Sequence, residues 1–182
     1  MAAALIDVTV AVLDALERFR APYALAGGLA ANLWVAGEHQ QATFDADAAV
    51  ASGVDPDALV RHLEAALERF GGFHSATLPF RKARIERLLC PPEIPVDLIL
   101  LKDTAYSALA LERAATTELR GKRYPVLRPE DVILHKSLGR REKDVAALSF
   151  LAGDNALDLE YVETWARRLG TWTFVRRALP RR

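Results

Sequence analysis

The segment 43–50, TFDADAAV, combines the alternating pattern of a β-strand with two carboxylates. Successive side chains of a strand point to opposite faces, so Asp45 and Asp47 are expected to point the same way. The other face carries the apolar side chains of Phe44, Ala46, Ala48 and Val50. Like charges this close repel, and Asp is a poor strand former. The pair therefore indicates either an exposed edge strand, whose charges discourage aggregation, or a divalent-metal site.

Two more features bear on chemistry. The stretch YALAGGLAANLW predicts a short strand over 23–28 and a helix over 29–36, with a glycine pair between them. Such a turn presents backbone N–H groups to a phosphate, although a glycine pair also serves simple turn formation. Asp97 is the only charge in the predicted strand 95–101. A buried Asp needs a metal or an ion pair, so a salt bridge to an Arg is the alternative to metal binding.

The order of these features resembles the nucleotidyltransferase (polymerase-β-like) superfamily. The segments YALAGGLAANLW and QATFDADAAV are similar to the GG-x-A…R-x-T-x-D-x-D motif of AbiEii-like abortive-infection toxins and related bacterial proteins. The resemblance implies transfer of a nucleotidyl group from an NTP, with two Mg²⁺ ions. It implies that Asp45, Asp47 and Asp97 bind metal and, with Lys136, form the catalytic set. The nucleotide-binding residues that it implies are Gly27, Gly28, Thr43, Lys136 and Arg140.

The segment 127–148 is similar to the downstream helical motif of the same proteins. On a continuous helix, Lys136, Arg140 and Asp144 are four residues apart and form one stripe. A salt-bridge ladder between Arg140 and Asp144 is the alternative interpretation, and a helix break at Gly139 would remove the stripe. Lys136 is the stronger functional candidate because it interrupts an apolar set.

The sequence departs from the motif near the carboxylates. Gln41 stands where the motif has an arginine, and alanines surround the Asp pair. These departures favour a second hypothesis: a degenerate member that binds a nucleotide or a partner without turnover. The acceptor stays open between RNA or tRNA, a protein, and a small molecule such as an aminoglycoside or lincosamide. A toxin-antitoxin or phage-defence role, with an antitoxin partner, follows from the resemblance alone.

Composition excludes several classes. The 182 residues include 24 basic and 24 acidic ones, which gives no overall attraction to nucleic acid or membranes. Six arginines in residues 155–182 make that end basic, which leans slightly towards RNA. One cysteine, Cys90, allows no intrachain disulfide, and the histidines lack zinc-ligand spacing. No apolar run is long enough for a membrane span, so a soluble, cytoplasmic protein is expected.

The predicted fold class is α+β: a nucleotidyltransferase-like mixed β-sheet flanked by helices, with a C-terminal helical part. The predicted domains are an α/β core over residues 1–128 and a helical subdomain over 129–182. Beyond the segments above, the pattern predicts helices over 4–19, 54–72 and 104–114, strands near 73–77 and 84–89, and a hairpin turning at Gly121. Helix is expected from Pro129 onward, with breaks near Gly153 and Gly170. The oligomeric state is left open.

Overall fold

The computed structural model describes residues 2–79 and 82–179. Its described strands form one mixed, seven-stranded sheet in the order β3-β4-β5-β2-β1-β7-β6. The strands are β1 (Tyr23–Leu25), β2 (Ala46–Val50), β3 (Phe73–Pro79), β4 (Ala83–Cys90), β5 (Ile94–Leu101), β6 (Ala115–Leu119) and β7 (Lys122–Val126). The β2–β5 and β1–β7 pairs are parallel and the others antiparallel. The predicted fold class, a mixed sheet flanked by helices, is confirmed.

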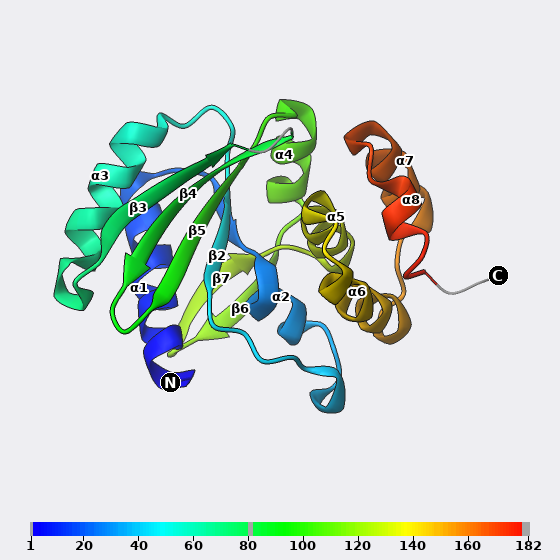
Figure 1. Cartoon of the computed structure of the whole chain (residues 1–182), viewed down its shortest axis with the longest axis horizontal. Helices are drawn as coiled ribbons and strands as arrows, with labels where there is room; N and C mark the ends of the chain where they lie inside the picture. Colours follow the sequence, from blue (N-terminus) through cyan, green and yellow to red (C-terminus); the bar gives the residue numbers. More distant parts are fainter. Residues whose placement is uncertain (1, 80–81, 180–182) are drawn as a thin grey trace.

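The helices gather in two groups around this sheet (Figure 1). Helix α1 packs against α3 and contacts β2 and β5, and α3 contacts β3 and β4, whereas α2 and α5 pack together and α5 also contacts α6, α7 and α8. The α-helices are α1 (Ala2–Phe19), α2 (Gly27–Leu33), α3 (Pro56–Leu67), α4 (Thr104–Glu112), α5 (Pro129–Gly139), α6 (Glu142–Asp154), α7 (Leu159–Leu169) and α8 (Trp172–Val175). Two short 3₁₀ helices are η1 (Gly37–His39) and η2 (Glu68–Phe70). None of the described helices combines the length and apolar character that crossing a membrane requires.

Local sequence signals fix several of these boundaries. The Asp55 side chain accepts hydrogen bonds from the first free N–H groups of α3, and Pro56 begins that helix. Gly170 ends α7 in the left-handed conformation, as the sequence predicts. Gly121 makes the turn between the antiparallel strands β6 and β7. Cys90 is fully buried at the end of β4, where it packs as a small hydrophobic residue.

Three predictions near the carboxylates are wrong in detail. Strand β2 begins at Ala46, so Asp45 lies just before it and Phe44 is 60% exposed and does not face the core. The edge-strand interpretation also fails, because β2 lies between β1 and β5 in the interior of the sheet. The helix α2 begins at Gly27, two residues earlier than predicted, because the glycine pair forms its first turn.

The helix predicted to continue through Arg140 is broken. Arg140 adopts the left-handed conformation, with φ of 49°, and separates α5 from α6. The stripe of Lys136, Arg140 and Asp144 on one helix is therefore wrong. The division into domains at residue 128 stays a prediction. Part of the predicted basic end, Arg181 and Arg182, lies outside the described residues.

Candidate active site

The central strands β2 and β5 bring two of the predicted carboxylates together. In the parallel ladder between them, Asp47 is the register partner of Asp97. Asp45 immediately precedes β2, so its side chain is close enough to influence Asp47 electrostatically. The sheet therefore brings Asp97 beside a pair of carboxylates that lies far from it in the sequence.

The glycine turn holds Asp47 in place. The N–H of Gly28 donates a hydrogen bond to the Asp47 carboxylate. A Cβ atom at Gly27 would lie 1.8 Å from Asp47 Oδ2, and Gly27 also has a φ of +64°. Both the close approach and the left-handed backbone require glycine at this position. One function of Gly27 is therefore to let the start of α2 touch the carboxylate.

The charge of Asp47 is costly where it lies. Burial raises the pKa of Asp47 to about 7, with the nearby charges of Asp45 and Asp97 adding to the rise. The Lys136 ammonium and the Gly28 N–H act in the opposite direction. Close carboxylates with too few counter-charges form an environment that a cation would relieve.

Thr43 links the second carboxylate to the same turn. Its Oγ1 donates a hydrogen bond of 3.1 Å to Asp45 Oδ1. A Cβ atom at Gly28 would lie 2.4 Å from Thr43 Oγ1, so glycine is required here as well. The loop before β2 is fixed to α2 by reciprocal hydrogen bonds between Asn32 and the backbone of Gln41.

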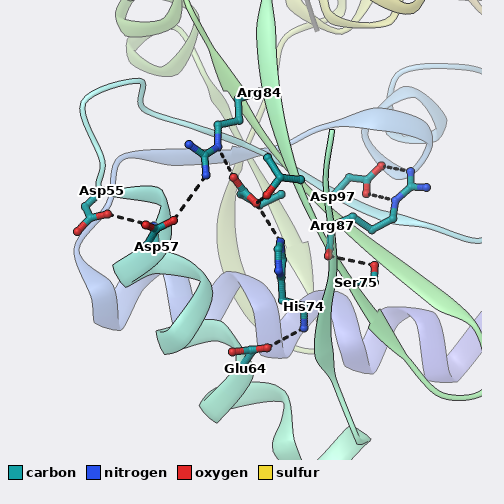
Figure 2. A network of polar contacts seen from close by, with 10 residues as sticks. Asp55, Asp57, Glu64, His74, Ser75, Arg84, Arg87 and Asp97 are labelled. Carbon is teal, nitrogen blue, oxygen red and sulfur yellow. Dashed lines mark hydrogen bonds and ion pairs between the residues drawn. The ribbon is translucent and has the colours of Figure 1, made fainter. Parts of the chain in front are cut away.

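Asp97 is held by an arginine that the sequence pattern did not single out. Arg87 on β4 donates to both oxygens of Asp97, at 2.7 Å from Nε and 2.6 Å from Nη2 (Figure 2). The two residues are register partners in the antiparallel β4–β5 pair. The alternative interpretation of Asp97, a salt bridge to an Arg, is therefore what the structure contains. The long-range register that selects Arg87 has no local signal in the sequence.

Basic groups from α5 and α6 form the wall that faces the carboxylates. Asp144 Oδ1 lies 3.2 Å from Lys136 Nζ, and Asp144 Oδ2 accepts a 2.7 Å hydrogen bond from Arg141 Nε. Arg140 donates to the carbonyl oxygen of Gly170 at 2.6 Å, whereas Asp144 pairs with Lys136 and Arg141, so the alternative interpretation of an Arg140–Asp144 ladder is wrong. The hydrogen bond to Asp144 raises the pKa of Arg141, and Asp45 adds to the rise.

These groups surround one cavity of about 900 Å³. All the site residues predicted from the sequence line it: Gly27, Gly28, Thr43, Asp45, Asp47, Asp97, Lys136 and Arg140. Arg87 and Arg141 join them as residues that sequence reasoning did not select. The structure thus brings the predicted residues together, while their roles stay predictions.

The donor set partly fits a magnesium ion. Mg²⁺ prefers carboxylate oxygens and is often held by one or two of them plus substrate phosphates, a set that Asp45 and Asp47 can supply. Among the described residues, however, no three His, Cys, Asp or Glu side chains are close enough to hold one ion together. Both oxygens of Asp97 accept hydrogen bonds from Arg87, which reduces what this carboxylate can offer to an ion.

Comparison with solved structures shows which known fold the chain resembles. No protein-family model and no curated protein matches the chain. Among solved structures, it is similar to the antibiotic-resistance factor ANT(2'')-Ia in solution, with a TM-score of 0.61 and 16% identity over 93% of both chains. The crystal structure of ANT(2'')-Ia in complex with adenylyl-2''-tobramycin gives a TM-score of 0.58 and 15% identity, over 91% of this chain and 96% of that one. The chain therefore has a nucleotidyltransferase-like fold.

Proposed function

We propose that the protein transfers a nucleotidyl group from an NTP to a hydroxyl acceptor with the help of Mg²⁺. The observation that carries the proposal is the arrangement of the cavity. Asp45 and Asp47 lie on one side, and Lys136 and Arg140 come from the helical wall. This is the charge pattern that a metal-bound triphosphate needs, since carboxylates hold the metal and cations neutralise phosphate oxygens.

In this proposal each group has a defined task. Asp45 and Asp47 hold the metal, which when bound supplies charge neutralisation at the phosphates. Gly27 and Gly28 keep Asp47 in position and leave the turn open to the nucleotide. Lys136, already in the cavity beside Asp144, neutralises the charge that develops on the phosphates.

The proposed reaction is a substitution at the α-phosphorus of the NTP. The acceptor oxygen forms a bond to the α-phosphorus, the bond from that phosphorus to the bridging oxygen breaks, and pyrophosphate leaves with the bond's electrons. The hydroxyl proton passes to a carboxylate of the site. The sequence resemblance assigns to Asp97 either this proton transfer or the binding of a second metal. Arg87 already donates hydrogen bonds to both oxygens of Asp97, which are the atoms that either role would use.

The charges of the cavity wall favour an anionic or neutral acceptor. Six lysine and arginine side chains line the cavity against four carboxylates. Asp97 and Asp144 are already ion-paired, and Asp45 and Asp47 are assigned to the metal. No carboxylate is then left among the described lining residues for the ammonium groups of a polycation such as an aminoglycoside. We therefore propose RNA, rather than a polycationic aminoglycoside, as the class of acceptor.

The test is label transfer from α-³²P-labelled NTPs in the presence of Mg²⁺, with total RNA and tobramycin offered as separate acceptors. We expect labelling of the RNA fraction, a loss of at least about 100-fold in Asp47→Asn, and no label on tobramycin. Asp7→Asn is the matched control, because Asp7 is an exposed carboxylate on α1 that pairs with Arg120 outside the cavity. Undiminished transfer by Asp47→Asn would refute the site assignment.

A second candidate is a nucleotide-binding protein without turnover. The closed Arg87–Asp97 pair and Gln41, in place of the arginine of the motif, favour it. Calorimetry with ATP and Mg²⁺ separates the two, because binding with no label transfer to any acceptor supports this candidate. A toxin role with an antitoxin partner, and the narrower likeness to AbiEii-like toxins, rest on the sequence resemblance alone.

A further inference from the structure

The Arg87–Asp97 pair occupies a place where a metal-dependent site would be expected to keep a free carboxylate. Both oxygens of Asp97 accept hydrogen bonds from the guanidinium, and Asp97 is only 6% exposed. Arg87 lines the same cavity as Asp45 and Asp47. In Figure 2 the pair lies apart from the network of Arg84 and His74. Arg87 is thus the basic side chain that the pairing of β4 with β5 places beside Asp97.

A bidentate arginine changes what Asp97 can offer to a metal. Two of the lone pairs of the carboxylate are engaged, and a permanent positive charge stands where a second divalent ion would approach. The charges of Asp45 and Asp47 also act on this guanidinium, and together with its hydrogen bonds to Asp97 they raise the pKa of Arg87. The guanidinium therefore lies within the electrostatic reach of all three carboxylates.

We infer that Arg87 takes the place of a second metal ion. Resting on the proposed function, this inference states that the pocket binds one divalent ion, through Asp45 and Asp47, while Arg87 neutralises Asp97 and keeps it from ligating. Arg87 is then a positioning residue that sets the metal stoichiometry. It differs from the two-ion site that the sequence resemblance implies, in which Asp97 is a ligand.

The test counts bound Mn²⁺ by electron paramagnetic resonance, with Mn²⁺ as the probe ion and no nucleotide present. We expect the wild-type protein to bind one ion and Arg87→Gln to bind two, because Asp97 is released. Arg84→Gln is the matched control: Arg84 lies on the same strand and is paired with Glu86, but it does not line the cavity. It should bind one ion, as the wild type does.

A second variant keeps the inference testable should Arg87→Gln fold poorly, which a thermal melt would reveal. The double variant Arg87→Gln/Asp97→Asn removes both partners without changing the net charge. If Asp97 is not a ligand, its single Mn²⁺ ion binds within about twofold of the wild-type affinity. If Asp97 is a ligand, the double variant loses at least about tenfold in affinity, consistent with the loss of a metal-binding group.

The outcomes separate this inference from the proposed function. Two ions in the wild type, an unchanged single ion in a folded Arg87→Gln, or a tenfold loss in the double variant overturns the inference alone. A wild-type protein that binds no Mn²⁺ overturns the inference together with the metal step of the proposed function. Label transfer retained by Asp47→Asn overturns the proposed site, whatever the Mn²⁺ count.

Discussion

Replacing Gly27 by alanine is expected to disturb the candidate site through a collision inside the fold. The new Cβ atom would lie 1.8 Å from Asp47 Oδ2 and 2.6 Å from Asp47 Cβ. Rotation of the Asp47 side chain moves the oxygen but leaves its Cβ in place. The backbone of either the turn or β2 must therefore shift, and the Asp47 carboxylate shifts with it.

The magnitude follows from two separate costs. A non-glycine residue in the left-handed region costs about 1–2 kcal/mol, and forcing atoms into a packed region costs about 1–3 kcal/mol more. We therefore expect Gly27→Ala to lose about 2–5 kcal/mol of unfolding free energy. Gly121→Ala is the matched control: its φ is +78° and no atom lies within 4 Å of a Cβ built there. Gly121→Ala should therefore lose only about 1–2 kcal/mol, which is what a non-glycine residue costs in the left-handed region.

The assay pairs urea denaturation with Mn²⁺ titration of both variants. Gly27→Ala should be less stable than Gly121→Ala by about 1–3 kcal/mol, and its Mn²⁺ affinity should fall at least about tenfold. Gly121→Ala should keep the wild-type affinity, because its turn joins β6 and β7 away from the cavity. Equal stability losses together with unchanged Mn²⁺ binding would show that Gly27 does not hold Asp47 in place.

Four further variants test polar side chains at three positions. Burial raises the pKa of Asp131 to about 6, so the folded state binds its proton more tightly than the unfolded chain; this group alone contributes about 3 kcal/mol of stability below about pH 4, which is lost as the pH rises to about 6. Burial lowers the pKa of His135 to about 4, so this group alone removes about 3 kcal/mol of stability as the pH drops from about 6.5 to 4. The two contributions oppose each other in the wild type, so Asp131→Asn should leave a fall in stability towards acid pH, and His135→Leu should leave a fall between about pH 4 and pH 6. Urea titrations from pH 4 to 7 check both, and variants that keep the wild-type profile contradict them. Thr43→Val, which loses the donor to Asp45, should weaken Mn²⁺ binding about tenfold in direct titration, whereas Thr43→Ser should preserve it.

Helix ends and turns that depend on neighbouring residues could be predicted from the sequence. Asp55 and Pro56 start α3, Gly121 forms a hairpin turn, and Gly170 ends α7, because each acts on backbone groups a few residues away. The glycine pair, the Asp-x-Asp pair and the lone Asp, which follow one another along the chain, all line one cavity. Local chemistry and the order of the motifs were therefore sufficient to locate the candidate site.

Contacts between distant strands could not be predicted in this way. The alternating pattern of TFDADAAV is the same for an edge strand and an interior one, so it could not reveal that β2 lies between β1 and β5. Likewise, a salt bridge at Asp97 could be anticipated, but its partner depends on the register of β4 against β5, which selects Arg87. Sheet order and register arise from packing over the whole chain.

The break at Arg140 illustrates a third limit. Arginine is a good helix former, and the left-handed conformation at a helix end is usually taken by glycine. Here Gly139 ends α5 and Arg140 takes the left-handed position, with its side chain bound to the carbonyl oxygen of Gly170. That contact joins the end of α5 to the loop after α7. A break at Gly139 is one of the alternatives that the sequence leaves open, but the left-handed Arg140 and its hydrogen bond to Gly170 depend on tertiary packing and could not be predicted.

The charge balance of the site depends on the order of the strands in the sheet. Parallel pairing makes Asp47 and Asp97 register partners on neighbouring strands. Two carboxylates placed in this way repel each other, and the repulsion destabilises the fold unless cations lie nearby. The chain supplies Arg87 from the strand on the far side of β5 and Lys136 from α5. Each counter-charge reaches the carboxylates only because its element packs where it does. A change of strand register would therefore separate these carboxylates from Arg87, so the interactions that specify the fold also set the charge balance of the pocket.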